Sequence, residues 1–153
     1  MLPRHRLRQI VNWLTLSTPF GLLLAVLGRA RISRQRDGLF IAEQSKLMLP
    51  DAGAFTVGNV IITGRPWEVM VTRYPDLLAH ETAHSSQWAW LGPLFLPLYV
   101  VWMGWSMIRT GDRASRNYLE RWAGLVRGGY REKAIRRLRP IPPSTDQDNA
   151  PAQ

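Results

Sequence analysis

The sequence contains no cysteine, few acidic residues and only 3 histidines. Without cysteine the chain has no disulfide framework and no thiolate ligand, so a bound metal must be held by His, Asp, Glu or solvent. The chain also lacks an internal repeat, a phosphate-binding glycine loop and a nucleophilic serine constellation. Its 153 residues support one compact domain with a modest core.

Positive charge dominates, with 20 Lys and Arg against 11 Asp and Glu and a formal net charge of +9. The basic residues gather in three clusters, at 4–8, 29–36 and 127–139. Two clusters flank apolar sequence, so anionic membrane lipids are the expected partner and nucleic acid is not favoured. A basic surface that is merely solvated is the alternative.

Two hydrophobic segments also indicate an association with a membrane. Residues 10–27 are apolar but interrupted by polar residues, and we predict an uncleaved interfacial or anchoring helix, with a signal peptide as the rival. Residues 91–108 are more hydrophobic and rich in Trp and Tyr, which favour membrane interfaces. Gly92-Pro93 and Pro97 are expected to bend or restart this segment, and a buried core helix is the alternative.

The motif His80-Glu81-Thr82-Ala83-His84 carries the chemistry of the chain. Pro75-Asp76 predicts a helix start, and nothing breaks a helix over residues 77–91. On a helix the two imidazoles lie on one face about one turn apart and can hold one Zn²⁺. A carboxylate beside the metal can accept a proton from water that the ion has acidified. The alternative is a histidine pair that binds no metal and is either solvated or hydrogen-bonded within the core.

A catalytic zinc usually has three protein ligands, so one more is needed. Residues 117–124 predict a helix on which Glu120 can supply a carboxylate. His5 is less favoured because it lies in a basic leader that repels a cation. The alternative for Glu120 is an exposed residue paired with Arg116 or Arg121. Two histidines and a carboxylate also suit iron and manganese.

Together these features resemble the gluzincin metallopeptidases, in particular small membrane-associated bacterial ones, in which HExxH precedes a second helix with a glutamate ligand. The resemblance spans roughly residues 54–124, and 54–63 is similar to the family's strand before its active-site helix. It implies a peptide or protein substrate paired with that edge strand. It implies four site residues, the ligands His80, His84 and Glu120 of one Zn²⁺ and the general base Glu81.

The chain departs from this family at one supporting position. Family members often carry an aspartate four residues after the ligand glutamate, where it supports the first histidine, but this chain has Gly124. Asn117 or Asp112 is the expected substitute. Gln87 extends the motif to HExxHxxQ, a form that also occurs in small bacterial zincin-like domains, and lies nearly on the metal face.

The third ligand also constrains the topology. Glu120 can reach a zinc on His80 and His84 only if residues 91–108 return to the same side of the membrane. We therefore predict a re-entrant, in-plane or buried segment, broken at Gly92-Pro93 and Pro97, rather than a single crossing.

Residues 38–72 are β-prone, and short runs there predict a small antiparallel sheet of 39–42, 54–57, 59–63 and 68–71. Gly58-Asn59 predicts a tight turn, with a single strand over 55–63 as the alternative, and Pro66 can instead begin a helical turn toward Val71. Near the C-terminus, Gly128-Gly129 is expected to end the glutamate-bearing helix, and a basic amphipathic helix is expected over 131–138.

We therefore predict an α+β fold, a helix-rich minimal zincin-like domain with a small antiparallel sheet and two hydrophobic helical segments. Residues 1–37 are expected to form a basic leader and anchor helix, 38–138 the metal-binding domain and 139–153 a disordered tail. The expected function is zinc-dependent peptide-bond hydrolysis at the cell membrane. The alternatives are a catalytically inactive zincin-like membrane-associated binding protein, and a basic membrane or nucleic-acid adaptor with an accidental HExxH.

Overall fold

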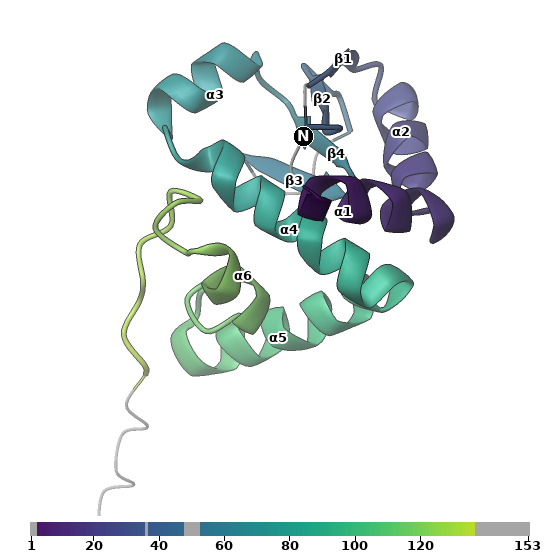
Figure 1. Ribbon diagram of the computed structural model, residues 1–153. Helices are drawn as coiled ribbons and strands as arrows, with labels where there is room; N and C mark the ends of the chain where they lie inside the picture. Colours follow the sequence, from purple (N-terminus) through teal and green to yellow (C-terminus); the bar gives the residue numbers. More distant parts are fainter. Residues whose placement is uncertain (1–2, 36, 48–52, 137–153) are drawn as a thin grey trace, which may run out of the picture.

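The computed structural model describes residues 3–35, 37–47 and 53–136 and has the predicted α+β architecture (Figure 1). The sheet lies on one side of the central helix α4, and α5 and α6 lie on the other (Figure 1). The elements are α1 (Pro3–Leu14), α2 (Ser17–Leu27), β1 (Arg31–Arg34), β2 (Phe40–Glu43), β3 (Ala54–Val57), β4 (Val60–Thr63), α3 (Trp67–Arg73), α4 (Leu77–Leu91), the short 3₁₀ helix η1 (Gly92–Leu94), α5 (Phe95–Thr110) and α6 (Tyr118–Ala123).

The four-stranded sheet has the order β1-β2-β4-β3 and is mixed, so it differs from the predicted small antiparallel sheet in one pairing. The pairs β1–β2 and β3–β4 are antiparallel, whereas β2 and β4 are parallel. Every residue of β4 is buried, which suits an inner strand with partners on both edges. This leaves β3 as an edge strand that faces α4.

The β3–β4 connection is the predicted tight turn at Gly58-Asn59 rather than a single long strand. Gly58 has φ +60 and packs so closely on α2 that an added Cβ would lie 2.5 Å from the backbone of Ser17 and Thr18. Only glycine fits such a position without displacement. The turn therefore fixes the hairpin against α2.

The run 68–71, predicted as a strand, lies in the helix α3, in agreement with the alternative that Pro66 begins a helical turn. The backbone N–H of Trp67 donates to a carboxylate oxygen of Glu43 at 2.7 Å, which satisfies one free donor at the helix start. The strand β1 was not predicted, because its residues are all exposed and show no alternation of apolar and polar side chains.

The segment 10–27, expected as one helix, forms parts of two helices that meet at an angle of 75°. Leu16 at the bend has φ +60. Asn12 on α1 is fully buried and its Nδ2 donates to Asn59 Oδ1 at 3.0 Å and to the carbonyl of Ser85 at 2.9 Å. The residues expected as a leader and anchor thus contribute to the same core as the sheet and α4.

The residues Leu77–Thr110 form a helical stretch of 34 residues that is long and apolar enough to cross a membrane. The chain nevertheless turns at Gly92, which has φ +54, so that α5 runs back beside α4 (Figure 1). The rings of His84 and Tyr99 lie 6.3 Å apart, whereas a straight helix would separate these residues by about 22 Å. Pro97 does not break α5, because it lies in the first turn, where a missing N–H is tolerated.

Two expectations near the C-terminus are wrong. The helix α6 ends at Gly124, which has φ +91, rather than at Gly128-Gly129. Residues 131–136 form no helix, so the described part of the expected amphipathic helix 131–138 is irregular. The expected disordered tail 139–153 lies outside the described residues.

Candidate metal centre

The two histidines of the motif and Glu120 converge in the interior between α4 and α6. His80, His84 and Glu120 are all buried. The Nε2 atoms of the histidines lie 3.2 Å apart, and Oε2 of Glu120 lies 3.2 Å from His80 Nε2 and 3.6 Å from His84 Nε2. The three residues form a group that could hold a metal ion.

The spacing of these three atoms matches tetrahedral coordination. Ligand atoms about 2.0 Å from a tetrahedral metal are separated from each other by about 3.3 Å. The separations of 3.2, 3.2 and 3.6 Å lie close to that value. The three residues could therefore hold a single small cation.

The hydrogen bonds on the far side of each imidazole determine which ring nitrogen faces the centre. Nδ1 of His80 contacts the carbonyl of Gly124 at 3.1 Å, and Nδ1 of His84 contacts Oε1 of Gln87 at 2.9 Å. The amide of Gln87 is oriented by its Nε2, which donates to the carbonyl of Leu119 at 2.8 Å. Both Nδ1 atoms thus face acceptors, and Nε2 of each ring is the nitrogen directed toward Glu120.

Gly124 takes the supporting role at His80 that was expected of Asn117 or Asp112. Gly124 stands four residues after Glu120, and its main-chain carbonyl supports His80 in place of a side chain. The expected substitutes are used elsewhere in the described structure. Asn117 caps α6 by accepting from the N–H of Leu119, and Asp112 accepts from backbone N–H groups in the loop between α5 and α6.

Glu120 is not paired with Arg116 or Arg121, both of which contact Glu132 instead. The hydroxyl of Tyr99 donates to Oε1 of Glu120, while Oε2 of Glu120 is buried with no hydrogen-bond partner among the described residues. One carboxylate oxygen is therefore held by the protein, and the other faces the two histidines.

The charges in the centre are strongly coupled. Burial alone would raise the pKa of Glu120, but its contacts with His80 and His84 outweigh burial and lower it. Burial alone would lower the pKa of His84, but Glu120 outweighs burial and raises it to about 9. Burial and the charge of Glu120 raise the pKa of Tyr99, so that its phenol remains a hydrogen-bond donor. An ionised carboxylate thus faces the imidazoles at neutral pH.

Glu81 lies beside this group and faces a cavity of about 290 Å³. It is buried, and its Oε2 accepts a hydrogen bond from Thr56 Oγ1 of β3 at 2.6 Å. The apolar walls of the cavity come from α2, β3 and α5, namely Phe20, Leu24, Phe55, Val57, Phe95 and Leu96. The carboxylate of Glu81 and the three possible ligands thus line one apolar cavity.

The sequence alone assigns no role in this centre to several residues that the structure places there. Thr56 and Tyr99 hold the two glutamates, and Tyr130 lines the cavity with its ring 6.0 Å from that of His80. A Cβ at Gly128 would lie 2.7 Å from Nε2 of His80. Residue 128 is therefore glycine because the backbone runs directly against the imidazole of His80. The glycines of Gly128-Gly129 were a visible signal, but we interpreted them as a helix end.

No protein-family model, no curated protein and no solved structure matches this chain.

Proposed function

We propose that the protein is a zinc-dependent hydrolase of peptide bonds that acts at a membrane. The observation that carries this proposal is the tetrahedral spacing of His80 Nε2, His84 Nε2 and Glu120 Oε2 beside the carboxylate of Glu81, in one cavity. Each of these groups has a partner that orients it. The buried carboxylate of Glu120 needs a positive partner, which a proton on His84 supplies in the metal-free protein and a metal ion would supply in its place.

Zinc suits the donor set of two imidazole nitrogens and one carboxylate oxygen, which is common at hydrolytic zinc centres with an open position. When bound, zinc would acidify a water molecule and polarise a substrate carbonyl. Gln87 and Gly124 contact Nδ1 of His84 and His80, which leaves Nε2 of each ring as the nitrogen that would bind zinc, and Tyr99 keeps Glu120 in place. Iron and manganese remain compatible with the same donors, and metal analysis separates them.

Glu81 is the proposed general base. Thr56 donates to Oε2 of Glu81, which leaves Oε1 to accept the proton of the attacking water. Glu81 then transfers this proton to the leaving amine nitrogen as the C–N bond breaks, and the carboxylate is regenerated. Because Glu81 is buried, little reorganisation of solvent around its carboxylate accompanies the proton transfer.

The edge strand β3 is the proposed platform for an extended peptide. Among the described residues it pairs with β4 alone, and it contributes Ala54, Phe55, Thr56 and Val57 to the cavity. Substrates that pair with a free strand edge gain main-chain hydrogen bonds, and pockets beside the edge select side chains. The apolar walls favour a peptide with a large apolar residue next to the scissile bond.

Membrane association is supported by exposed apolar side chains on two helices. On α2 they include Leu23, Val26 and Leu27, and on α5 they include Val100, Val101 and Ile108. Apolar surface of this extent is typical of membrane or protein interfaces. The basic residues that flank these helices favour anionic lipid.

Metal analysis and one variant test the proposal. We expect about one zinc per chain in protein purified in detergent, lost in His84→Ala and reduced in Glu120→Ala. Glu81→Gln is expected to retain zinc but lose cleavage of fluorogenic peptides, whereas Glu68→Gln, the same change at an exposed position, is expected to retain both. Equal cleavage by Glu81→Gln would exclude Glu81 as the base. Zinc binding with no cleavage that depends on Glu81 would instead indicate an inactive zincin-like binding protein.

A further inference from the structure

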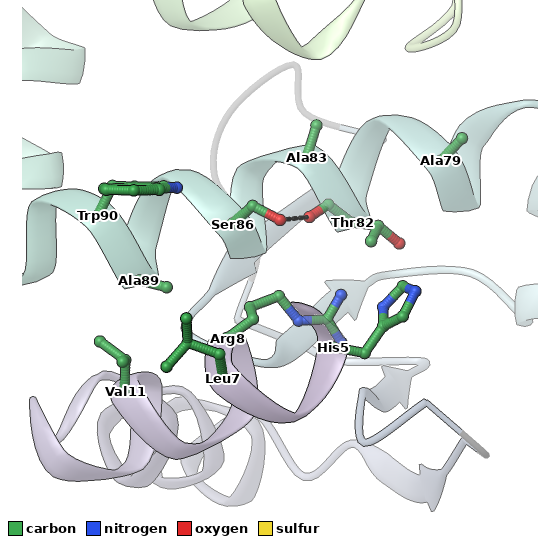
Figure 2. Close-up of a pocket in the computed structure, with 10 residues that line it drawn as sticks. All are labelled: His5, Leu7, Arg8, Val11, Ala79, Thr82, Ala83, Ser86, Ala89 and Trp90. Atoms are coloured by element: carbon green, nitrogen blue, oxygen red, sulfur yellow. Dashed lines mark hydrogen bonds between the residues drawn. The ribbon is translucent and has the colours of Figure 1, made fainter. Parts of the chain in front are cut away.

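A second pocket, of about 570 Å³, lies between α1 and α4 (Figure 2). Its α4 wall includes Ala79, Thr82, Ala83 and Ser86, which lie on a different face of the helix from His80 and His84. The volume is in the range of sites that bind small molecules. The metal centre does not use this pocket.

The two ends of the pocket differ in chemistry. His5 and Arg8 lie together toward one end, and Val11 and Trp90 lie toward the other (Figure 2). A ligand that fits both ends must therefore combine a polar or charged group with an apolar body.

Arg8 indicates the charge of that polar group. Its side chain is only 5% exposed, and Nη2 donates to the carbonyl of Asp37 at 2.9 Å. Its Nε is buried and has no hydrogen-bond partner among the described residues. Burial lowers the pKa of Arg8, and the charge of Asp37 opposes this only in part. A buried cation with an unused donor favours an anion as its partner.

The α4 wall of the pocket suits hydrocarbon. The hydroxyl of Thr82 donates to the carbonyl of Leu78 at 2.6 Å, and that of Ser86 donates to the carbonyl of Thr82 at 3.0 Å. Both donors are thus used within the helix. Together with Ala79 and Ala83 they leave a shallow wall of small side chains that offers no free hydroxyl hydrogen to a sugar or nucleotide.

The rim of the pocket is apolar and exposed. Leu7 is 64% and Trp90 is 81% exposed, and the neighbouring α1 residues Ile10 and Leu14 are exposed as well. Tryptophan and leucine at the rim would lie at the level of the lipid headgroups and chains if this face meets a membrane. The pocket is therefore open on a surface that a bilayer can cover.

We propose that this pocket binds one anionic phospholipid of the membrane, with the phosphate at Arg8 and an acyl chain running toward Val11 and Trp90. The charge of Arg8 matches the phosphate, and the small residues of α4 make room for the chain. Since the pocket and the metal centre occupy different faces of α4, a lipid held here would orient that helix at the bilayer surface.

Native mass spectrometry of the full chain, released from bilayer discs of phosphatidylglycerol or phosphatidylcholine, tests the proposal. We expect one phosphatidylglycerol per chain to remain bound and phosphatidylcholine to dissociate. Arg8→Gln and Ala83→Leu are expected to weaken retention about tenfold, the first by removing the charge and the second by filling the pocket. Arg6→Gln removes the same charge from an exposed position of α1 and is expected to change nothing.

Equal retention of the two lipids, or no effect of Ala83→Leu, would overturn the proposal in favour of bulk lipid. A dimer that Ala83→Leu dissociates would overturn it in favour of a helix of a second copy packed on the small residues. If Arg8→Gln does not fold, Ala83→Leu still decides, because it leaves Arg8 in place. Zinc content should be unchanged in the folded variants, so this result is independent of the proposed hydrolysis.

Discussion

The main-chain carbonyl of Gly124 lies 3.1 Å from Nδ1 of His80, and it thereby orients the first histidine of the motif. A side-chain support for this histidine would depend on the residue type at one position. A main-chain support depends instead on the backbone conformation, and Gly124 has φ +91, which L side chains rarely adopt. The requirement for glycine at this position thus follows from the backbone conformation at the end of α6.

Gly124→Ala is therefore expected to destabilise the protein by about 1–2 kcal/mol and to weaken zinc binding, because the strained backbone moves the carbonyl away from His80. Gly104→Ala is the matched control. Gly104 lies inside α5 with nothing within 4 Å of an added Cβ, so this change should be neutral or slightly stabilising. Urea unfolding of the two variants, with and without zinc, measures the difference. Equal stability would mean that the glycine conformation is not needed.

The bounds of α4 could be predicted because local signals mark both ends. Pro75-Asp76 precedes its first residue and Gly92-Pro93 follows its last, so Leu77–Leu91 could be read from the sequence. Glu120 could be proposed because residues 117–124, downstream of the hydrophobic segment, have a helical pattern that contains a carboxylate. In both cases the information lies within a few neighbouring residues.

The remaining features depend on contacts between distant segments. The parallel pairing of β2 and β4 depends on the insertion of β4 between β2 and β3, which the short apolar runs do not specify. The support from Gly124 could not be found because every residue has a carbonyl, and only the fold shows which one faces His80. Tyr99 reaches Glu120 only after the turn at Gly92, so its role is also invisible in the local pattern.

Gln87 should determine zinc affinity through His84. Gln87→Leu removes the acceptor at Nδ1 and is expected to lower zinc affinity by about 10- to 100-fold, the usual cost of losing such a partner. Gln87→Glu keeps an acceptor for His84 and should lose less, although it no longer donates to the carbonyl of Leu119. Competition with a fluorescent chelator measures both constants. Similar affinity in Gln87→Leu and the wild type would show that the contact has no role in metal binding.

The stability of metal-free protein should depend on pH through His84. The pKa of His84 is raised from 6.5 to about 9 in the folded protein, mainly by Glu120 acting against burial. A raised pKa stabilises the folded state fully below the unfolded value of 6.5, and this contribution is lost as the pH rises toward 9. Melting temperatures of chelator-treated protein should therefore fall between these pH values.

Glu120→Gln is the control for this titration, because it removes the charge that raises the pKa of His84. Its melting temperature should vary less over the same interval. Zinc replaces the proton on His84, so zinc affinity of the wild type should rise with pH over this interval and then level off. An unchanged pH profile in Glu120→Gln would mean that another group is responsible.

Thr56 should affect catalysis without affecting the metal. Thr56→Val has nearly the same shape but cannot donate to Oε2 of Glu81, so the carboxylate loses its only hydrogen bond to β3. We expect the rate of peptide cleavage to fall about tenfold, because a buried carboxylate loses a charge-assisted bond that also fixes its direction. Zinc content should stay at the wild-type level, since the hydroxyl of Thr56 donates to Glu81 and Thr56 is not one of the three possible ligands.

Thr72→Val is the matched control for this prediction, because the hydroxyl of Thr72 donates to the carbonyl of Glu68 on the exposed face of α3. Cleavage rates and zinc content of the two variants, measured side by side, separate a role in positioning Glu81 from a general loss of stability. A loss of zinc in Thr56→Val would indicate that β3 supports the whole centre rather than the base alone. If both valine variants cleave at the wild-type rate, the contact between Thr56 and Glu81 does not contribute to catalysis, and the orientation of Glu81 must come from packing within α4.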